Sequence, residues 1–221
     1  MKVCSDACLF GAWVAEQLSR TTAKPKTVLD IGTGTGLLAL MIAQKTQATI
    51  HAVELDENAF LQAVENFKAS PWSTRLTAHH ADVTGFLPRI AYDIIISNPP
   101  FYEQSLRSKD EQKNKAKHSG SLSYEGLAGA VANKLSTTGK FYVLLPYASF
   151  NSFTAKAAEH GLFPQELVYV KQTTTHNFFR VMAVFSFDKT SSLREQTITI
   201  KSGNNYDPEF VTLLKDYYLY L

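Results

Sequence analysis

The sequence predicts an α/β fold with a mostly parallel sheet and helices on both faces. Between residues 27 and 146, apolar runs of strand length alternate with segments of helical periodicity, which is the pattern of βαβ units. A glycine-rich turn follows the first of these strands and precedes a buried helix, as at the opening of a nucleotide-binding unit. Residues 163–171 and 177–187 are long, rich in Val, Phe and Tyr, and joined by a short polar turn. They predict an antiparallel hairpin at the sheet edge.

The 221 residues are expected to form one domain, because a chain of this length leaves little room for a second. Residues 1–26 predict an N-terminal helix and a linker, residues 102–120 a basic loop, and residues 196–201 one more short strand. The C-terminal segment predicts a helix that packs on the core, since its apolar side chains recur at helical spacing. These side chains are Phe210, Leu213, Leu214, Tyr217, Tyr218 and Leu221.

Composition argues for an ordinary globular protein, with 45% hydrophobic and 19% charged residues. No apolar run reaches membrane-spanning length and the first residues lack the apolar core of a signal peptide, so we expect a cytoplasmic protein with no membrane partner. Cys4 and Cys8 are too close in sequence to predict a structural disulfide, which suits a reducing compartment. We expect no metal, because no cluster of His, Cys, Asp and Glu has ligand spacing.

The glycine-rich turn at residues 32–36 favours S-adenosylmethionine over a dinucleotide. In the dinucleotide fingerprint G-x-G-x-x-G the third glycine comes one residue later, at the position that Leu37 occupies here. The carboxylate of Asp30, just ahead of the turn, has the wrong sign for a pyrophosphate but suits the ammonium of an amino-acid moiety. Asp30, Gly32 and Gly34 are therefore candidate cofactor contacts, because glycines let the backbone approach a ligand closely.

Acidic residues also follow the next two predicted strands. Glu54 ends the second strand, about 20 residues beyond the glycine turn, where a carboxylate binds ribose hydroxyls. Both cofactors would need it, so it does not discriminate between them. Asp82 ends the third strand and can accept from an adenine amino group, with the Val83 N–H close to the ring; alternatively, Asp82 caps a short helix after it. Asp6 is a weaker cofactor candidate, and its alternative role is to cap the first helix.

A buried strand at residues 92–97 runs into Asn98-Pro99-Pro100-Phe101, at the carboxyl edge where open α/β sheets bind ligands. The Asn98 side-chain oxygen and the Pro99 carbonyl can accept both hydrogens of one planar NH2 group, and Phe101 can stack on the ring that carries it. The alternative is that the prolines only end the strand. Together with the glycine turn, the tetrapeptide predicts a site that binds an exocyclic amine.

The segment that follows is basic. Residues 107–118 hold five Lys or Arg and two acids, a local charge of +3 within a chain of net charge +2. A polyanion that approaches the amine site would meet this segment first. The alternative is a solvated loop. The candidate contacts to such a polyanion are Arg107, Lys113, Lys115, Lys117 and His118.

The turn at residues 30–36 together with Asn98-Pro99-Pro100-Phe101 resembles the class I amino-methyltransferases. A narrower pattern is similar to the bacterial tRNA1(Val) adenine-N6-methyltransferase family over nearly the whole chain. It consists of Met1-Lys2-Val3, Asp6, Leu9-Phe10-Gly11-Ala12-Trp13, Lys117-His118, Tyr206, Pro208-Glu209-Phe210 and Tyr217-Tyr218-Leu219. The resemblance implies a Rossmann-like fold with a seven-stranded sheet and an antiparallel C-terminal hairpin. It also implies S-adenosylmethionine as methyl donor, the N6 amine of adenosine 37 as acceptor, and binding of the tRNA anticodon stem-loop by a monomer.

Other functions share parts of this pattern. A protein glutamine N5-methyltransferase also presents an amide nitrogen to an Asn-Pro-Pro turn, and ribosomal-RNA adenine or guanine amino-methyltransferases carry the same motifs. The aromatic ring of Phe101 and the basic segment favour a nucleobase. A dinucleotide-binding oxidoreductase is disfavoured by the glycine spacing and by Asp30, and a non-catalytic RNA-binding module by the intact cofactor turn.

Overall fold

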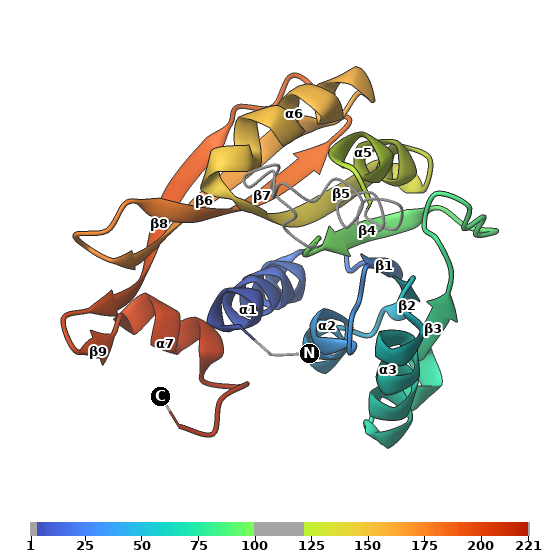
Figure 1. Cartoon of the computed structure of the whole chain (residues 1–221), viewed down its shortest axis with the longest axis horizontal. Helices are drawn as coiled ribbons and strands as arrows, with labels where there is room; N and C mark the ends of the chain where they lie inside the picture. Colours follow the sequence, from blue (N-terminus) through green and yellow to red (C-terminus); the bar gives the residue numbers. More distant parts are fainter. Residues whose placement is uncertain (1–3, 100–121, 221) are drawn as a thin grey trace, which may run out of the picture.

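One twisted sheet organises the protein, whose computed structural model describes residues 4–99 and 122–220 (Figure 1). The strands are β1 (Thr27–Ile31), β2 (Thr49–Glu54), β3 (Leu76–His80), β4 (Tyr92–Ser97), β5 (Leu135–Pro146), β6 (Phe163–Thr173), β7 (Phe178–Ser186), β8 (Arg194–Ser202) and β9 (Asn205–Tyr206). Among the described residues they form a nine-stranded sheet of order β3-β2-β1-β4-β5-β7-β6-β8-β9. The strands from β3 to β5 are mutually parallel, whereas β7 is antiparallel to both of its neighbours.

Helices cover both faces of this sheet, which explains why the central parallel strands are nearly continuous apolar runs. The helices are α1 (Ser5–Arg20), α2 (Leu37–Lys45), α3 (Glu57–Ala69), α5 (Tyr124–Ala132), α6 (Phe150–Glu159) and α7 (Pro208–Leu214), with short 3-10 turns η1 (Ser73–Arg75) and η2 (Tyr147–Ser149). Figure 1 shows α1, α2 and α3 on one side and α5 and α6 on the other. Each side has its own buried apolar cluster.

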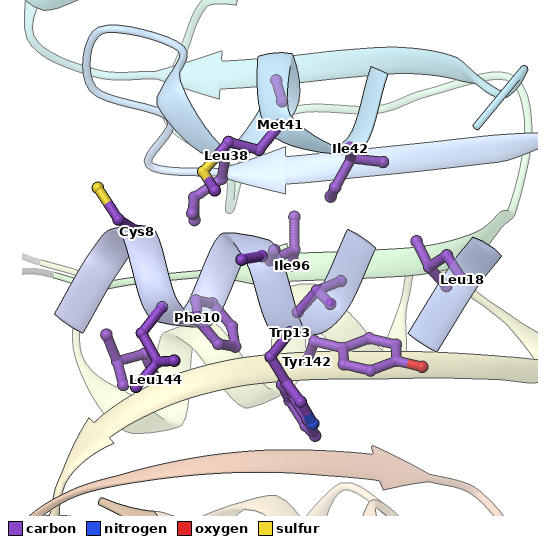
Figure 2. Close-up of a cluster of buried hydrophobic side chains, with 14 of the residues drawn as sticks. Cys8, Phe10, Trp13, Leu18, Leu38, Met41, Ile42, Ile96, Tyr142 and Leu144 are labelled. Carbon is purple, nitrogen blue, oxygen red and sulfur yellow. The ribbon is translucent and has the colours of Figure 1, made fainter. Parts of the chain in front are cut away.

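Helix α1 packs beside α2 on one face of the sheet, against side chains of β4 and β5 (Figure 2). Phe10 and Trp13 are buried, and the Trp13 ring meets the edge of Tyr142 on β5 at a centroid distance of 5.7 Å. A Cβ at Gly11 would lie 2.5 Å from the sulfur of Met41, so this glycine allows α1 and α2 to approach closely. The packing holds α2, and with it the glycine turn that precedes α2, against the sheet.

The predicted fold class is confirmed: β1–β7 form the expected seven-stranded sheet with the β6–β7 hairpin. Strands β8 and β9 extend it further, because residues 194–202 pair in parallel with β6 along most of its length. The third strand is shorter than expected and ends at His80. The C-terminal helix also ends early, at Leu214, and Leu219 is 93% exposed.

Cys4 is exposed and Cys8 is buried. No helix within the described ranges has the length and apolar character needed to cross a bilayer.

Candidate active site

The glycine turn and the Asn98-Pro99 segment leave the sheet from adjacent parallel strands at the same level. Ile31, the last residue of β1, is paired with Ser97, the last residue of β4. The Ser97 hydroxyl donates a hydrogen bond to the Ile31 carbonyl at 2.9 Å, and the Gly32 N–H donates to the Val53 carbonyl of β2 at 2.8 Å. These contacts hold the ends of three neighbouring strands together.

A cavity of about 410 Å³ opens at this edge. Its wall is formed by the turn after β1, the end of β2, the segment after β3, the end of β4 and the start of α5. The lining residues are Ile31, Gly32, Val53, Glu54, Leu55, Ala81, Asp82, Val83, Thr84, Ser97, Pro99, Leu122, Ser123 and Gly126. Five residues predicted from the sequence are among them, and they come from four separate segments: Gly32, Glu54, Asp82, Val83 and Pro99.

Three glycines of the turn after β1 have left-handed backbone angles, with φ of 68° at Gly32, 59° at Gly34 and 87° at Gly36. Side chains rarely tolerate this conformation. A Cβ at Gly36 would lie 2.5 Å from the ring of Phe67, so this glycine lets α3 pack against the turn. A Cβ at Gly32 would have no described atom within 4 Å apart from its own chain neighbours, and Gly32 lines the cavity. The absent side chain therefore leaves open space for a ligand.

The carboxylate of Glu54 is held by three backbone N–H groups. One oxygen accepts from Gly34 at 2.7 Å, and the other accepts from Leu55 and Asp56 at 2.9 Å each. The side chain thus ties the glycine turn to the end of β2. Each carboxylate oxygen has two lone pairs, so the side chain can still accept from hydroxyl groups in the cavity.

Asp82 stabilises a turn rather than a helix. Its Oδ1 accepts from the backbone N–H and the hydroxyl of Thr84, both at 2.8 Å. No helix forms over residues 84–87, so the alternative role of Asp82 as a helix cap is wrong. Oδ2 receives no hydrogen bond from the described parts of the chain and is available to a ligand amine. Val83 is buried and lines the same end of the cavity.

Asn98 presents a buried acceptor without a donor. Its Oδ1 is buried, and no described residue donates to it. An unpaired buried polar atom costs about 1–3 kcal/mol, so it marks a position where a ligand N–H would be favourable. Pro99, the next residue, is buried and lines the cavity. The predicted ring-stacking residue Phe101 lies outside the described residues, as do Arg107, Lys113, Lys115, Lys117 and His118.

Asp30 is placed differently from the sequence-based expectation. Its side chain is fully buried on β1 and does not line the cavity. Oδ2 accepts from the Thr33 hydroxyl at 2.6 Å, while Oδ1 has no donor among residues 4–99 and 122–220. Burial raises the pKa of Asp30 to about 7, even though Thr33 and the backbone N–H of Ala39 lower it. This placement supports a role in holding the glycine turn, and it argues against direct contact with a ligand ammonium.

Asp6 is not among the residues that line the cavity. It lies in the first turn of α1, whose N-cap is Cys4, so it does not cap the helix. Its Oδ2 accepts from Arg180 Nε on β7 at 2.8 Å, and the pair connects α1 to the hairpin. The sequence could not show this partner, because 173 residues lie between the two side chains.

Sequence reasoning missed several lining residues, notably Ser97, Leu122 and Ser123. Ser123 caps α5 by accepting from the Gly126 N–H at 3.0 Å, and its position just ahead of an apolar helix could have identified it. In the residues that the structure describes, no three His, Cys, Asp or Glu side chains are arranged to hold a metal ion.

Known methyltransferases are similar to this chain in sequence. The family model of the methyltransferase small domain matches residues 12–143. The chain is 38% identical to the tRNA1(Val) (adenine(37)-N6)-methyltransferase of Flavobacterium johnsoniae, over 99% of this chain and 93% of that protein. It is 40% identical to the protein of the same name from Dyadobacter fermentans, over 99% and 91%. The chain belongs to this methyltransferase family.

Solved structures show the same fold at low sequence identity. A predicted O-methyltransferase from Agrobacterium tumefaciens superimposes with a TM-score of 0.73 at 16% identity, covering 95% of both chains. The glycopeptide N-methyltransferase MtfA in complex with S-adenosylmethionine gives a TM-score of 0.59 at 13% identity, covering 80% of this chain and 94% of that one. These solved methyltransferases therefore share the fold of this chain.

Asp30→Asn should change how stability depends on pH. In the wild type the folded state binds the Asp30 proton more tightly than the unfolded state, whose carboxyl has a pKa of about 3.9. The contribution of neutral Asp30 to the free energy of unfolding is complete below about pH 4 and is lost as the pH rises toward 7. The amide of the Asp30→Asn variant does not ionise, so this contribution does not change with pH. Its oxygen can still accept from the Thr33 hydroxyl.

Urea unfolding of both ligand-free proteins at pH 5 and at pH 7.5 measures the difference. We expect the variant to gain roughly 1–4 kcal/mol relative to the wild type between the two pH values. Parallel pH profiles would show that Asp30 is ionised in the folded protein throughout this range.

Proposed function

We propose that this protein uses S-adenosylmethionine to methylate the exocyclic N6 amine of adenosine 37 in tRNA1(Val). One observation carries the proposal: Asn98, whose Oδ1 has no donor among the described residues, directly follows Ser97, and Ser97 is paired with Ile31, the residue before the glycine turn. An acceptor for an amine and a backbone turn suited to a cofactor thus occupy one sheet edge. The relatives' printed names supply the acceptor base and the RNA.

The residues of the cavity fit the methyl donor, which supplies an electrophilic methyl group on a sulfonium. The backbone at Gly32 and Gly34 would lie against it, because the missing side chain at Gly32 leaves the space open. Glu54 would accept from the ribose hydroxyls and Asp82 Oδ2 from the adenine amino group, with Val83 beside the ring. Asp30 would not contact the donor directly. It would position the glycine turn through its hydrogen bond with the Thr33 hydroxyl.

Asn98 and Pro99 would hold the acceptor amine. An aromatic exocyclic amine is a weak nucleophile, because its lone pair is delocalised into the ring. Acceptance of both N–H groups, by Asn98 Oδ1 and by the Pro99 carbonyl, localises the lone pair and directs it toward the donor. The amine becomes acidic as the new C–N bond forms, so its proton can leave late to water. The rate gain comes from positioning and from electrostatic stabilisation.

The RNA contacts predicted from the sequence lie in the part of the chain that the structure does not describe. Phe101 would stack on the target base once that base is turned out of its loop. Arg107, Lys113, Lys115, Lys117 and His118 would contact phosphates of the anticodon stem-loop. One copy of the chain carries all of these groups, so we propose that it acts as a monomer.

Mass spectrometry of nucleosides tests the function. Purified enzyme is incubated with isotope-labelled S-adenosylmethionine and either total tRNA, ribosomal RNA or a glutamine peptide. We expect labelled N6-methyladenosine in tRNA1(Val), and none when its adenosine 37 is replaced by guanosine. Label that appears only in ribosomal RNA or in the peptide would overturn the assigned substrate.

Asn98→Ala should lower kcat for tRNA methylation by at least about tenfold, because it removes an acceptor that acts on the reacting amine. The affinity for S-adenosylhomocysteine, measured by calorimetry, should change little. Asn58→Ala, at an exposed position on α3, is the matched control. Near-normal turnover of Asn98→Ala would refute the amine-binding mechanism.

Gly32→Ala should weaken binding of S-adenosylhomocysteine by roughly tenfold, since the added methyl enters the space assigned to the ligand. Gly203→Ala is the control, because Gly203 has a similar φ of 63° and equally open surroundings but lies in the turn between β8 and β9. The two variants therefore share the backbone strain and differ in location. Equal affinities would show that the donor does not lie against Gly32.

A further inference from the structure

Three aromatic rings form a cluster, here called the aromatic rim, that the proposed chemistry does not use. Its members are Tyr147 of η2, Tyr169 of β6 and Phe178 of β7. Centroid distances are 6.0 Å from Tyr147 to Tyr169, 5.5 Å from Tyr147 to Phe178 and 5.0 Å from Tyr169 to Phe178. The rings come from three elements that pairing in the sheet brings together.

The aromatic rim lies at the same edge of the sheet as Asn98. Strand β5 is parallel to β4 with Ser97 opposite Val143, so β5 continues three residues further, to Pro146, or about 10 Å. Tyr147 follows at once. Strand β7 is antiparallel to β5 and begins at this edge with Phe178. The rim therefore extends beyond the end of β4 in the strand direction. Across the sheet, its rings lie on or directly after the first, second and third strands beside β4, which are about 5–15 Å from it.

The rim is accessible and has a cation beside it. The Tyr147 residue is 47% exposed, and Tyr169 and Phe178 are half-buried. The Nζ of Lys171 lies 4.8 Å from the centroid of the Phe178 ring. The Tyr169 hydroxyl donates to Glu195 at 2.7 Å, which holds that ring in place. An exposed aromatic surface with an adjacent ammonium is the combination that binds single-stranded nucleic acid.

We infer that the aromatic rim stacks a base of the RNA that neighbours the target adenosine, while Lys171 lies near the phosphate of that nucleotide. The inference rests on the proposed function and adds a substrate-positioning surface to it. Tyr147 follows a strand that runs about 10 Å farther along the strand direction than β4. A base that flanks the target adenosine can therefore reach the rim while the target amine lies at Asn98.

Tyr147→Leu removes the stacking ring and keeps an apolar side chain at a half-exposed position, so the fold should be retained. In steady-state methylation of a tRNA1(Val) transcript we expect KM for RNA to rise about fivefold or more, since each stacked base contributes substantially to affinity. The dissociation constant of S-adenosylhomocysteine should not change. Tyr147→Phe, which keeps the ring, should restore KM to within about twofold of the wild type.

Phe163→Leu is the matched control. Phe163 is half-buried, and the Nζ of Lys189 lies 5.5 Å from the centroid of its ring, so it pairs an aromatic ring with an ammonium as the rim does. It differs in location, because it begins β6 at the opposite edge of the sheet. A second readout places the fluorescent base 2-aminopurine on either side of the target adenosine. Wild-type enzyme should quench one of these positions by stacking, and Tyr147→Leu should not.

The outcomes separate this inference from the proposed function. If the wild type methylates the transcript but Tyr147→Leu and Phe163→Leu have the same KM and the same quenching as the wild type, the rim does not bind RNA. If the wild type transfers no methyl group to any RNA, the proposed function itself fails. Quenching that survives in Tyr147→Leu would also overturn the inference, even where KM rises.

Discussion

The parallel pairing of β1 with β4 is the constraint on which the site depends. It sets Ile31 opposite Ser97, and the Ser97 hydroxyl locks that register by donating to the Ile31 carbonyl. A slip of one residue would turn every side chain of one strand to the other face. Gly32 and Pro99 would then no longer line the same cavity. Helix α1 supports this arrangement from below, because it packs on both α2 and the central strands (Figure 2).

Groups that are unfavourable for stability gather at this edge of the sheet. Asp30 is buried with a raised pKa, and Asn98 has an acceptor without a described donor. A buried polar group without a partner is costly in the free protein, and a ligand that binds it relieves the cost. The two apolar clusters on either side of the sheet offset these costs. The packed layers of helices and sheet therefore supply the stability, and the sheet edge carries the groups of the candidate site.

Much of the fold and part of the site could be predicted, because the signals are local. A strand, a glycine turn and a helix follow one another within residues 27–45, and left-handed glycines are required wherever such a turn forms. Glu54 and Asp82 were found because the carboxyl ends of parallel strands meet at one edge. The β6–β7 hairpin followed from its two runs of β-branched and aromatic residues.

The sequence by itself thus determined the order of elements, the edge at which the site forms and the residue types that meet there. Only the tertiary structure decided which side chains face the cavity. Asp30 is fully buried and accepts from the Thr33 hydroxyl. Asp6 pairs with Arg180 of β7, a strand far from it in the sequence. The aromatic rim likewise joins η2, β6 and β7, which are brought together by strand pairing over long separations. Side-chain direction and distant partners depend on packing between layers, and no local pattern of residues encodes them.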